Sequence, residues 1–289
     1  MVCPVCRNVE FVSYLKVNDF NVIRCKKCKL GITHPFPSTE QSLQANLETY
    51  NSEQRIQLYL TKIDYFKKRY RKYLQNIRNY KPQGKLLDVG CNIGLFLVTA
   101  KEEGFEATGI ELNKECADYG VKNFELDIVN DYLENRGFQD GTFDIVTMFD
   151  VLEHIPDMRN ALGEVRRVLK KDGLLVVQLP NLDSIMARIT GSNWVWLTTP
   201  DHLYHFNPKN LSEFLLSNGF RIKYLRTWEP SEDFSSNFIQ AFCPNGIIGR
   251  AMKKILRLSK VVLLATHLLR PFWWRKYRGG LIEVYATKV

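Results

Sequence analysis

The chain has 289 residues, of which 45% are hydrophobic and 25% are charged, and it carries a formal net charge of +9. This composition excludes a disordered or fibrous protein, and no uncharged apolar run reaches the length of about 18 residues that a transmembrane helix needs. Met1 leads directly into a cysteine motif, so we expect no signal peptide. Seven cysteines in such a chain favour a reducing, cytoplasmic compartment and metal binding over disulfides.

Two cysteine pairs mark the first 36 residues. Cys3 and Cys6 form one C-x2-C pair, and Cys25 and Cys28 form a second pair after 18 intervening residues. Four thiolates at this spacing are typical of a structural zinc ribbon, whose closed tetrahedral site supplies stability rather than catalysis. A segment this short cannot bury a large core, so the metal would supply its folding energy. We predict a zinc ribbon over residues 1–36; the alternative is four free thiols.

A linker and an amphipathic helix follow in residues 37–83. Pro35, Pro37 and Ser38 form the start of the linker. Apolar residues recur at helical spacing from Ile56 to Ile77, which predicts one helix from about residue 52 to residue 80. The opposite face of this helix is rich in Lys and Arg, as expected for a side exposed to solvent.

The segment 85–96, KLLDVGCNIGLF, predicts a strand, a glycine turn and a helix. Glycine lets the backbone approach a ligand closely, and a helix start offers free N–H groups to an anionic group. Glu111 ends the next predicted strand, 21 residues after Gly90, at the spacing where a carboxylate binds ribose hydroxyls. Asn92 occupies the middle position of the turn, so the dinucleotide pattern G-x-G-x-x-G is absent. The turn therefore favours a nucleoside ligand with an amino-acid end.

Strands and helices alternate over the rest of the chain. Lys171-Asp172-Gly173 is typical of a helix stop, and Asn207-Pro208 is typical of a helix start. This alternation predicts an α/β fold with a parallel sheet and helices on both faces. The predicted strands are 85–89, 106–111, 124–129, 143–149, 173–179, 220–228 and 281–288, and the predicted helices are 93–103, 113–122, 157–170 and 208–218.

Four segments resemble class I S-adenosylmethionine (SAM) methyltransferases of the methyltransferase-23 type. They are LLDVGCNIG, GIEL, FDIVTMFDVLEHIPD and EVRRVLKKDGLLVVQLPN, in the order and spacing of that family. The resemblance covers residues 84–289 and implies a Rossmann-like seven-stranded sheet with an antiparallel edge. It also implies that the helix before the first strand lies over the SAM cleft as a lid, although plain packing is the interpretation we favour for that helix.

The resemblance further implies a set of SAM contacts at the carboxyl ends of the first four strands. Asp88 would order the glycine turn and the SAM amino group, Glu111 would take the ribose hydroxyls, and Leu112 would lie against the adenine. An acidic residue after the third strand would reach the adenine amino group, and we favour Asp131 over Asp127. The predicted cofactor-binding residues are Asp88, Gly90, Cys91, Asn92, Gly94, Glu111, Leu112, Asp131, Phe149 and Asp150.

Asp150, Glu153 and His154 follow the fourth predicted strand at i, i+3 and i+4. If the chain is helical there, all three side chains share one face and could hold a divalent ion such as Mg²⁺. A similar acidic-x-x-Glu-His element in quinone O-methyltransferases and in a group of small-RNA methyltransferases implies that such an ion would polarise an acceptor hydroxyl. The alternative, which we favour, is that Glu153 and His154 order the loop and cap the next helix.

The stretch 194–206, WVWLTTPDHLYHF, combines aromatic residues with two histidines three positions apart. It follows the fifth predicted strand, where the resemblance implies insertions that bind the acceptor. His205 or His202 is our candidate base for deprotonating an acceptor hydroxyl. Each could instead be a packed histidine, and methyl transfer from a reactive sulfonium can proceed by positioning without a named base.

Residues 229–279 depart from a minimal fold and are predicted to form a basic, amphipathic helical insertion. Its segment 247–278 holds nine Lys and Arg and no acidic residue, with Trp273 and Trp274 close to cations. This composition suits contact with an anionic membrane surface, as in a peripheral protein of the inner membrane face. It equally suits a helical cap over the acceptor site.

Together these features predict a SAM-dependent methyltransferase that acts on the hydroxyl of a small molecule, a sugar or a lipid-linked glycan. The cysteine motif and the prolines after His34 resemble an arrangement found in many sugar and polysaccharide-linked methyltransferases. This resemblance favours such an acceptor over nucleic acid. The alternatives are an RNA methyltransferase that uses its basic residues for phosphate contacts, and a non-catalytic SAM-fold scaffold at a membrane.

Overall fold

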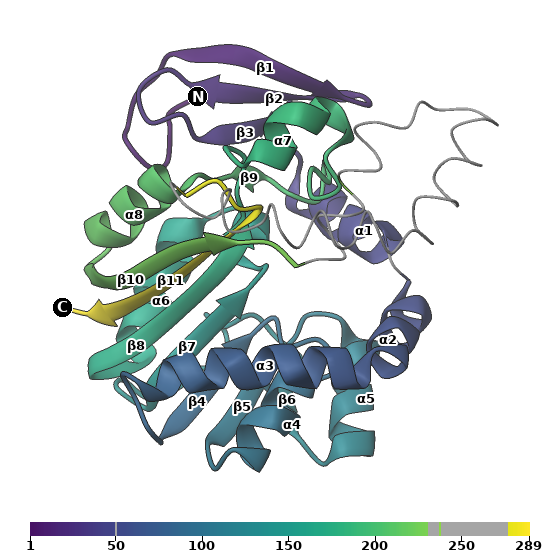
Figure 1. Ribbon diagram of the computed structural model, residues 1–289, viewed down its shortest axis with the longest axis vertical. Helices are drawn as coiled ribbons and strands as arrows, with labels where there is room; N and C mark the ends of the chain where they lie inside the picture. The colour runs from purple at the N-terminus through teal and green to yellow at the C-terminus, as the bar shows by residue number, and fades with distance from the viewer. Residues whose placement is uncertain (50, 231–236, 238–276) are drawn as a thin grey trace, which may run out of the picture. The chain divides into compact units, whose positions relative to one another are not determined.

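A computed structural model describes residues 1–49, 51–230, 237 and 277–289 of the chain (Figure 1). The chain divides into two compact units, each built from separate stretches of sequence. The first, here the ribbon unit, comprises Met1–Ser42, Gln178–Phe214 and Leu225–Glu283. The second, here the sheet unit, comprises Leu43–Val177, Leu215–Tyr224 and Val284–Val289.

A seven-stranded mixed sheet, in the order β10-β11-β8-β7-β4-β5-β6, forms the framework of the fold. β4 pairs in parallel with β5 and β7, and β5 pairs in parallel with β6. The last two strands, β10 and β11, run in opposite directions (Figure 1), as the family resemblance implies. The strands are β4 (Lys85–Val89), β5 (Glu106–Ile110), β6 (Asp127–Val129), β7 (Phe143–Phe149), β8 (Leu169–Pro180), β10 (Phe220–Trp228) and β11 (Leu281–Lys288).

Apolar residues on the central strands build the core of the sheet unit. Leu86, Leu87, Ile145 and Val146 are fully buried, as expected for parallel strands covered on both faces.

The helices of the sheet unit are α2 (Ser52–Thr61), α3 (Ile63–Arg78), α4 (Leu95–Glu102), α5 (Lys114–Phe124), α6 (Met158–Val168) and the short 3₁₀ turn η1 (Leu152–His154). Two further helices, α1 (Thr39–Thr49) and α8 (Pro208–Ser217), each contain residues of both units.

The expectation of one helix over residues 52–80 is wrong, because the chain forms two helices. Lys62 has φ −114° and ψ 25° and serves as the C-cap of α2 and the N-cap of α3. The apolar positions Leu60 and Ile63 keep helical spacing across this break, so the sequence pattern does not reveal it.

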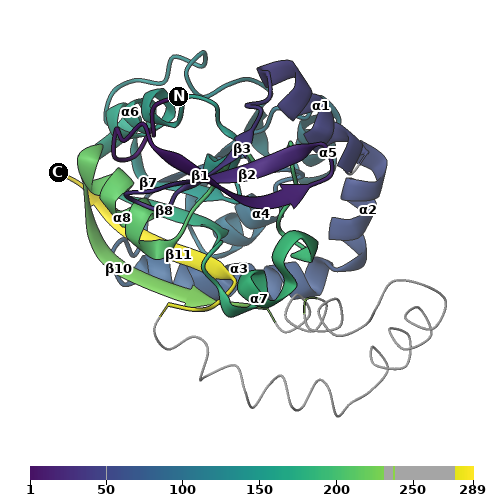
Figure 2. The same ribbon diagram turned by 90° about the horizontal axis from the view of Figure 1, so that it is seen from above.

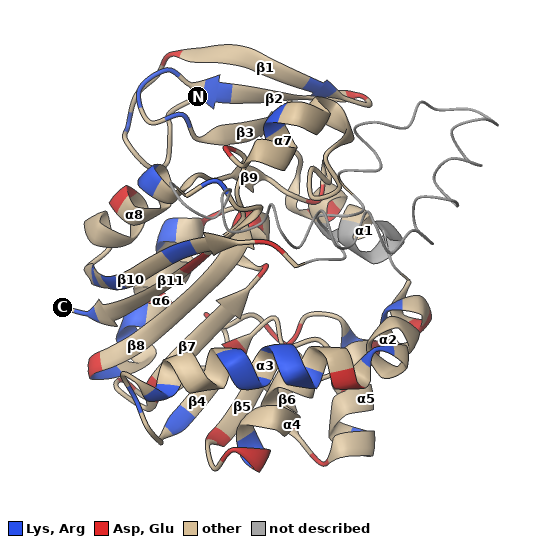
Figure 3. Cartoon of the chain, in the orientation of Figure 1, with Lys and Arg blue, Asp and Glu red and all other residues tan. Residues whose placement is uncertain are grey.

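Figure 3 shows the basic side of α3. Lys67 and Arg71 on this side pair with Glu102 at the end of α4, and Arg78 pairs with Glu103. Three basic residues of α3 are thus paired with acidic residues of the sheet unit.

The predicted helix stop at residues 171–173 is also misplaced. α6 ends at Val168, and β8 begins with the next residue. Asp172, with φ 60°, and Gly173 lie inside the first part of this strand instead. The predicted start at Asn207 is confirmed, because its Oδ1 accepts the N–H of Asn210 at 2.9 Å in the first turn of α8.

The ribbon unit contains a four-stranded antiparallel sheet in the order β1-β2-β3-β9. Figure 2 shows β1, β2 and β3 side by side. These strands are β1 (Phe11–Val17), β2 (Phe20–Cys25), β3 (Gly31–His34) and β9 (Tyr204–His205); α7 (Ile185–Thr190) and the 3₁₀ turn η2 (Gly191–Asn193) precede β9. β9 comes from the predicted acceptor insertion and pairs Tyr204 with Ile32 and His205 with Gly31.

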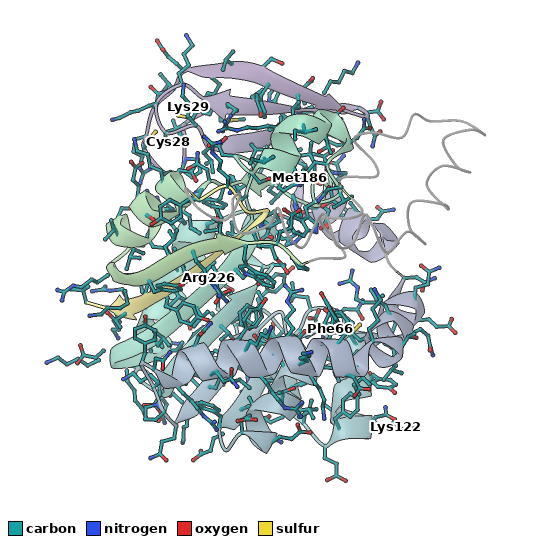
Figure 4. All side chains as sticks on the ribbon, in the orientation of Figure 1. Cys28, Lys29, Phe66, Lys122, Met186 and Arg226 are labelled. Atoms are coloured by element: carbon teal, nitrogen blue, oxygen red, sulfur yellow. The ribbon has the colours of Figure 1, made fainter. Side chains whose placement is uncertain are left out.

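A small hydrophobic cluster packs under this sheet. Its members come from β1 and β2 and from residues 182–197, which follow β8. They are Val17, Val22, Leu182, Met186 (labelled in Figure 4), Ala187, Trp194 and Leu197. The ribbon unit therefore joins two stretches that lie far apart in the sequence.

The predicted insertion 229–279, including its basic segment 247–278, lies almost entirely outside the described residues. Among the helices that the structure describes, none is long and apolar enough to cross a membrane.

Candidate active site

The glycine turn after β4 has the backbone conformation that a close ligand approach requires. Gly90, Asn92 and Gly94 have positive φ values of 75°, 52° and 79°. A Cβ on Gly90 would lie 2.5 Å from Cγ2 of Val151, so no other residue fits there without movement. The N–H groups of Gly90 and Cys91 donate to the carbonyl of Ile110 at 2.8 and 3.0 Å. The turn is thus fixed to the end of β5.

Glu111 follows β5 directly and is oriented by two backbone donors. Its Oε2 accepts the N–H of Asn92 and its Oε1 accepts the N–H of Asn113, each at 2.8 Å. Burial raises the pKa of Glu111, while these hydrogen bonds and the nearby charge of Arg55 act in the opposite direction. The result is a buried carboxylate whose direction is set by the glycine turn and by the start of α5.

Asn113 connects this carboxylate to two helices. Its Oδ1 accepts the N–H of Cys116 at 2.9 Å and caps α5. Its Nδ2 also donates to the hydroxyl of Ser52 in the first turn of α2 at 3.0 Å. The helix pair before β4 is therefore tied to the same edge of the sheet as Glu111.

Asp88 lies at the end of β4, where it is 3% exposed. Its Oδ1 accepts the hydroxyl of Thr147 on β7 at 2.6 Å. Burial raises the pKa of Asp88 to about 7; the Thr147 hydrogen bond lowers it, and the charge of Glu111 raises it. A buried carboxyl group with this pKa gains most from a cationic ligand, because a positive charge favours its ionised form.

An aromatic wall stands beside these carboxylates. Phe149, the last residue of β7, stacks on Tyr73 of α3 with ring centroids 4.9 Å apart and meets the edge of Phe96 at 5.0 Å. Tyr70 contacts the edge of Phe96 at 5.4 Å. Phe66 (labelled in Figure 4) extends the row along α3 and stacks on Tyr59 at 4.5 Å. The apolar face of α2 and α3 is thus an aromatic surface over the first helices of the sheet.

Sequence reasoning missed two arginines on these helices. Arg69 Nε donates to the hydroxyl of Tyr73 at 2.7 Å. Burial alone would lower the pKa of Arg69, but the charges of Tyr73 and Asp150 raise it, so this guanidinium stays charged near Asp150. Arg55 acts electrostatically on both Glu111 and Tyr59. Their place on the apolar side of an amphipathic helix was the available signal.

Asn130 is a third residue that the sequence did not reveal. It follows β6, and its Nδ2 donates to the carbonyls of Glu111 at 2.8 Å and Leu112 at 2.9 Å. Leu112 itself is 42% exposed and available for contact with a flat ring. Asp127 accepts the hydroxyl of Thr108 at 2.9 Å, whereas Asp131 accepts the N–H of Tyr132 at 2.7 Å. Both acidic candidates after β5 therefore have local partners, and Asn130 lies between them.

The segment after β7 does not form the helical face that would align Asp150, Glu153 and His154. Asp150 has φ 56°, and only a single 3₁₀ turn, η1, follows. The carboxylate of Glu153, which is 1% exposed, and the imidazole of His154 approach within 4.8 Å of each other, but Asp150 does not join them in a three-ligand group among the described residues. Asp150 instead acts on Tyr59, whose pKa is raised to about 12, chiefly by burial and next by the Asp150 charge.

The four N-terminal cysteines come together in the ribbon unit. Their sulfur atoms all lie within 4.8 Å of one another, with 3.5 Å between Cys3 and Cys28 and 3.5 Å between Cys6 and Cys25. None of these four cysteines forms a disulfide. A tetrahedral site with zinc–sulfur bonds of about 2.3 Å places its sulfurs roughly 3.8 Å apart. The donor set and its spacing therefore fit zinc.

The histidine segment belongs to the same unit. His202 and His205 are 8% and 3% exposed, and their rings lie 6.3 Å apart. Thr33 of β3 donates its hydroxyl to the carbonyl of His202 at 2.6 Å, and the same oxygen lies 3.0 Å from Nε2 of His205. The aromatic residues of the segment also pack locally: Trp194 meets Trp196 at 5.7 Å, and Tyr204 meets Phe36 at 5.7 Å.

Comparison with known sequences identifies the family and several relatives. Residues 59–225, more than half of the chain, match the family Methyltransf_23, described as a methyltransferase domain. The chain is 29% identical over 146 residues to a ubiquinone biosynthesis O-methyltransferase of Actinobacillus pleuropneumoniae serotype 7, covering 46% of this chain and 62% of that relative. It is 27% identical over 180 residues to a protein of the same name from Pelagibacter ubique, covering 56% of this chain and 75% of the relative. The chain thus spans less than two thirds of the first of these relatives.

Solved structures agree on the fold. A SAM-dependent methyltransferase from Archaeoglobus fulgidus matches with a TM-score of 0.54 at 21% identity, covering 78% of this chain and 94% of the other. The family match, the order of the sheet and the glycine turn with its acidic partners lead to one conclusion. The chain belongs to the Methyltransf_23 family and has the fold of a class I SAM-dependent methyltransferase, with four clustered cysteines near its N-terminus.

Proposed function

We propose that this enzyme transfers the methyl group of SAM to a hydroxyl oxygen of a small molecule, a sugar or a lipid-linked glycan. The observation that carries the cofactor part is the Glu111 carboxylate, held by two backbone N–H groups beside the glycine turn. The names of the relatives, ubiquinone biosynthesis O-methyltransferases, support oxygen as the methylated atom. Their acceptor is not carried over, because the identity is low.

In this proposal each part of SAM meets a different group of the sheet unit. Asp88, ionised in the complex, takes the amino group, and Glu111 takes the two ribose hydroxyls. The adenine lies against Leu112, with Asn130 and Asp131 at its edge. Phe149 and Tyr73 form the wall beside the sulfonium, where an apolar surface excludes water from the reacting methyl group.

SAM supplies an electrophilic methyl group, and the chain supplies positioning and a place for the proton. The acceptor oxygen forms a bond to the methyl carbon while the carbon–sulfur bond breaks and leaves S-adenosylhomocysteine. The acceptor proton passes to a base, for which His205, His202, Glu153 and His154 are the candidates. In-line alignment of the two reacting atoms supplies much of the rate, as in other reactions governed by proximity.

A divalent ion such as Mg²⁺ is a further element of the proposal, at Glu153 and His154 without Asp150. The buried carboxylate of Glu153 within 4.8 Å of His154 favours it. Carboxylate and imidazole are suitable ligands for such an ion, which would polarise the acceptor hydroxyl. Full activity after EDTA treatment and gel filtration would eliminate the ion, whereas recovery on adding Mg²⁺ would support it.

The cysteine cluster is proposed to hold one structural zinc ion. Cys3, Cys6, Cys25 and Cys28 would supply four thiolates and leave no open position for a substrate. The ion would fix the hairpin between β2 and β3 and so supply folding energy to the ribbon unit.

Isothermal titration of the purified chain with SAM and with S-adenosylhomocysteine tests the central claim. We expect micromolar binding that is lost in Asp88→Ala and kept in Glu115→Ala, a matched acidic residue exposed in the first turn of α5. Absence of binding by the unmodified chain would contradict the proposal and favour a scaffold role. Methylation assays against glycan, quinol and RNA substrates would then identify the acceptor class.

A further inference from the structure

One residue of β3, Thr33, makes three contacts with the histidine segment through two of its atoms. The backbone N–H of Thr33 donates to the carbonyl of Leu203 at 3.0 Å. Its hydroxyl donates to the carbonyl of His202 at 2.6 Å and lies 3.0 Å from Nε2 of His205. Thr33 is 0% exposed, so no water competes for these partners. A single residue thus contacts both candidate bases, at the backbone of one and the ring of the other.

Counting protons at this hydroxyl fixes the state of the His205 ring. A threonine hydroxyl has one proton and two lone pairs. The His202 carbonyl can only accept, so the Thr33 proton is used there. The contact at 3.0 Å is then a hydrogen bond only if Nε2 of His205 carries a proton and donates it to the Thr33 oxygen. In the neutral ring, Nδ1 is therefore the nitrogen with the lone pair.

We propose that Thr33 is a positioning residue that holds His205 as the Nε2–H tautomer and so makes Nδ1 its proton-accepting atom. The orientation of a histidine is commonly set by the hydrogen bond that its other nitrogen makes. Here the partner is a hydroxyl of the cysteine ribbon, contributed from 172 residues earlier in the chain. The ribbon then determines which atom of the histidine can receive an acceptor proton.

The cysteine cluster is connected to Thr33 by a short stretch of chain and by backbone hydrogen bonds. The N–H of Cys25 donates to the carbonyl of Leu30 at 2.9 Å and closes the turn that leads into β3. The carbonyl of Cys28 accepts Nδ2 of Asn210, a fully buried residue of α8, at 3.3 Å. Thr33 follows Cys28 by five residues. A change at the sulfur atoms therefore acts on both the strand that carries Thr33 and the helix that follows His205.

A second connection joins the ribbon to residues on either side of the histidine segment. Arg24 of β2 donates to Oδ1 of Asp183 at 2.6 Å, and Asn207 donates to Oδ2 of the same carboxylate at 2.8 Å. The Arg24 side chain is 14% exposed and that of Asp183 is 24% exposed, so this ion pair is largely shielded from solvent. The ribbon thereby holds the segment on both sides of the histidines. We infer that loss of the metal would release His205 from its tautomer.

Nuclear magnetic resonance of histidine side chains tests the assignment without an acceptor. The chain has five histidines, so a long-range ¹H–¹⁵N spectrum of ¹⁵N-histidine-labelled protein resolves each ring, and His205→Gln assigns one of them. We expect the Nε2–H pattern for His205 in the unmodified chain. Thr33→Val should lose this pattern, and Thr33→Ser, which keeps the hydroxyl, should retain it.

Thr190→Val is the matched control. Thr190 is a buried threonine of the same unit, and its hydroxyl donates to the carbonyl of Met186 at 2.7 Å rather than to either histidine. This variant should leave the His205 signals unchanged. An Nδ1–H pattern for His205 in the unmodified chain would overturn the assignment, and this result does not depend on the stability of Thr33→Val. An unchanged His205 signal in Thr33→Val would also overturn it.

Metal removal supplies a separate readout. Treatment with a zinc chelator should move the His205 signals toward a mixture of tautomers, and zinc should restore them; unchanged signals after complete zinc loss would contradict the link between ribbon and histidine. The inference rests on the proposed function only in assigning His205 to the acceptor side. Failure of SAM to bind would remove that assignment and leave the tautomer result standing, so the two failures are distinguishable.

Discussion

The two units of this protein are stabilised in different ways. The sheet unit relies on parallel strands whose apolar residues, such as Leu87 and Val146, are fully buried between helices. The ribbon unit has short strands, a small apolar cluster, and a large share of buried polar contacts, including those of Thr33, Asn207 and Asn210. We therefore expect its stability to depend more on the cysteine site and on side-chain hydrogen bonds.

This difference extends to their functional residues. In the sheet unit, Asp88, the glycine turn and Glu111 come from neighbouring strands and lie within 24 residues of chain. In the ribbon unit, the histidine segment is placed by a hairpin at the other end of the sequence. The cofactor side should respond to pH and to single carboxylate changes, whereas the acceptor side should respond to metal loss. Four predictions test this separation, in order of decreasing effect.

The largest effect is expected from Cys25→Ser. Structural zinc in small domains contributes about 10 kcal/mol or more to folding, so losing one of four ligands should unfold the ribbon locally. Elemental analysis should find one zinc per unmodified chain and much less in the variant. Hydrogen exchange should accelerate over residues 11–34 and 199–207.

The control is Cys116→Ser, a buried cysteine of α5 that lies outside the cluster. It should keep its zinc. Rapid exchange over residues 85–111 in Cys25→Ser would contradict the separation, since it would show that the sheet unit also requires the ribbon site.

The second prediction concerns pH and Asp88. Its pKa is about 7 in the folded protein and 3.8 without the fold, so the native state binds more protons between these values. The contribution of Asp88 to stability is therefore fully present below pH 3.8 and is lost as pH rises toward 7, by up to ~4 kcal/mol at 1.36 kcal/mol per pKa unit. Denaturant unfolding of Asp88→Asn should lack this loss, and the variant should be more stable than the unmodified chain at pH 8.

The affinity for SAM should change with pH in the opposite direction to the stability contribution of Asp88. In the proposed complex the SAM amino group meets an ionised Asp88, so the affinity of the unmodified chain should rise with pH up to about 7. Titrations at pH 6 and pH 8 would measure this change. An affinity that is independent of pH in this range would show that Asp88 does not contact the cation.

The third prediction is that Glu111→Ala weakens SAM binding by roughly 100-fold. Hydrogen bonds to a charged group contribute about 1.5–3 kcal/mol each, and two ribose hydroxyls would lose their acceptor. The truncation also leaves the N–H groups of Asn92 and Asn113 without their carboxylate. Calorimetry with Glu115→Ala as the control measures the effect; a loss of less than tenfold would remove Glu111 from the ribose site.

The features that the sequence predicted differ between the two units in the same way. The strand, the turn and Glu111 were predictable because a parallel sheet brings the ends of neighbouring strands together and the spacing is local. The four cysteines were predictable as a cluster because two C-x2-C pairs at this spacing are typical of one metal site. Each of these features depends on a few consecutive residues and on one known geometry.

Other features depend on contacts that no local pattern records. The pairing of β3 with β9 joins residues about 170 positions apart, so the role of Thr33 could not be predicted. Asn130 acquired its position from the turn after β6. The positive φ of Asp150 turned the expected helical face into a 3₁₀ turn, since one residue in the left-handed region ends regular geometry.

The smallest expected effect comes from Thr147→Val, which removes a hydroxyl without touching the ligand directly. The Thr147 hydrogen bond at 2.6 Å lowers the pKa of Asp88, so its loss should raise that pKa further, because the ionised carboxylate loses a donor. The pH midpoint of SAM binding should move up by the same amount, with affinity at pH 7 reduced several-fold and little change at pH 9. Thr147→Ser keeps the donor and should behave like the unmodified chain. A uniform loss of affinity at every pH would mean that Thr147 acts by packing, and would separate its role from the ionisation of Asp88.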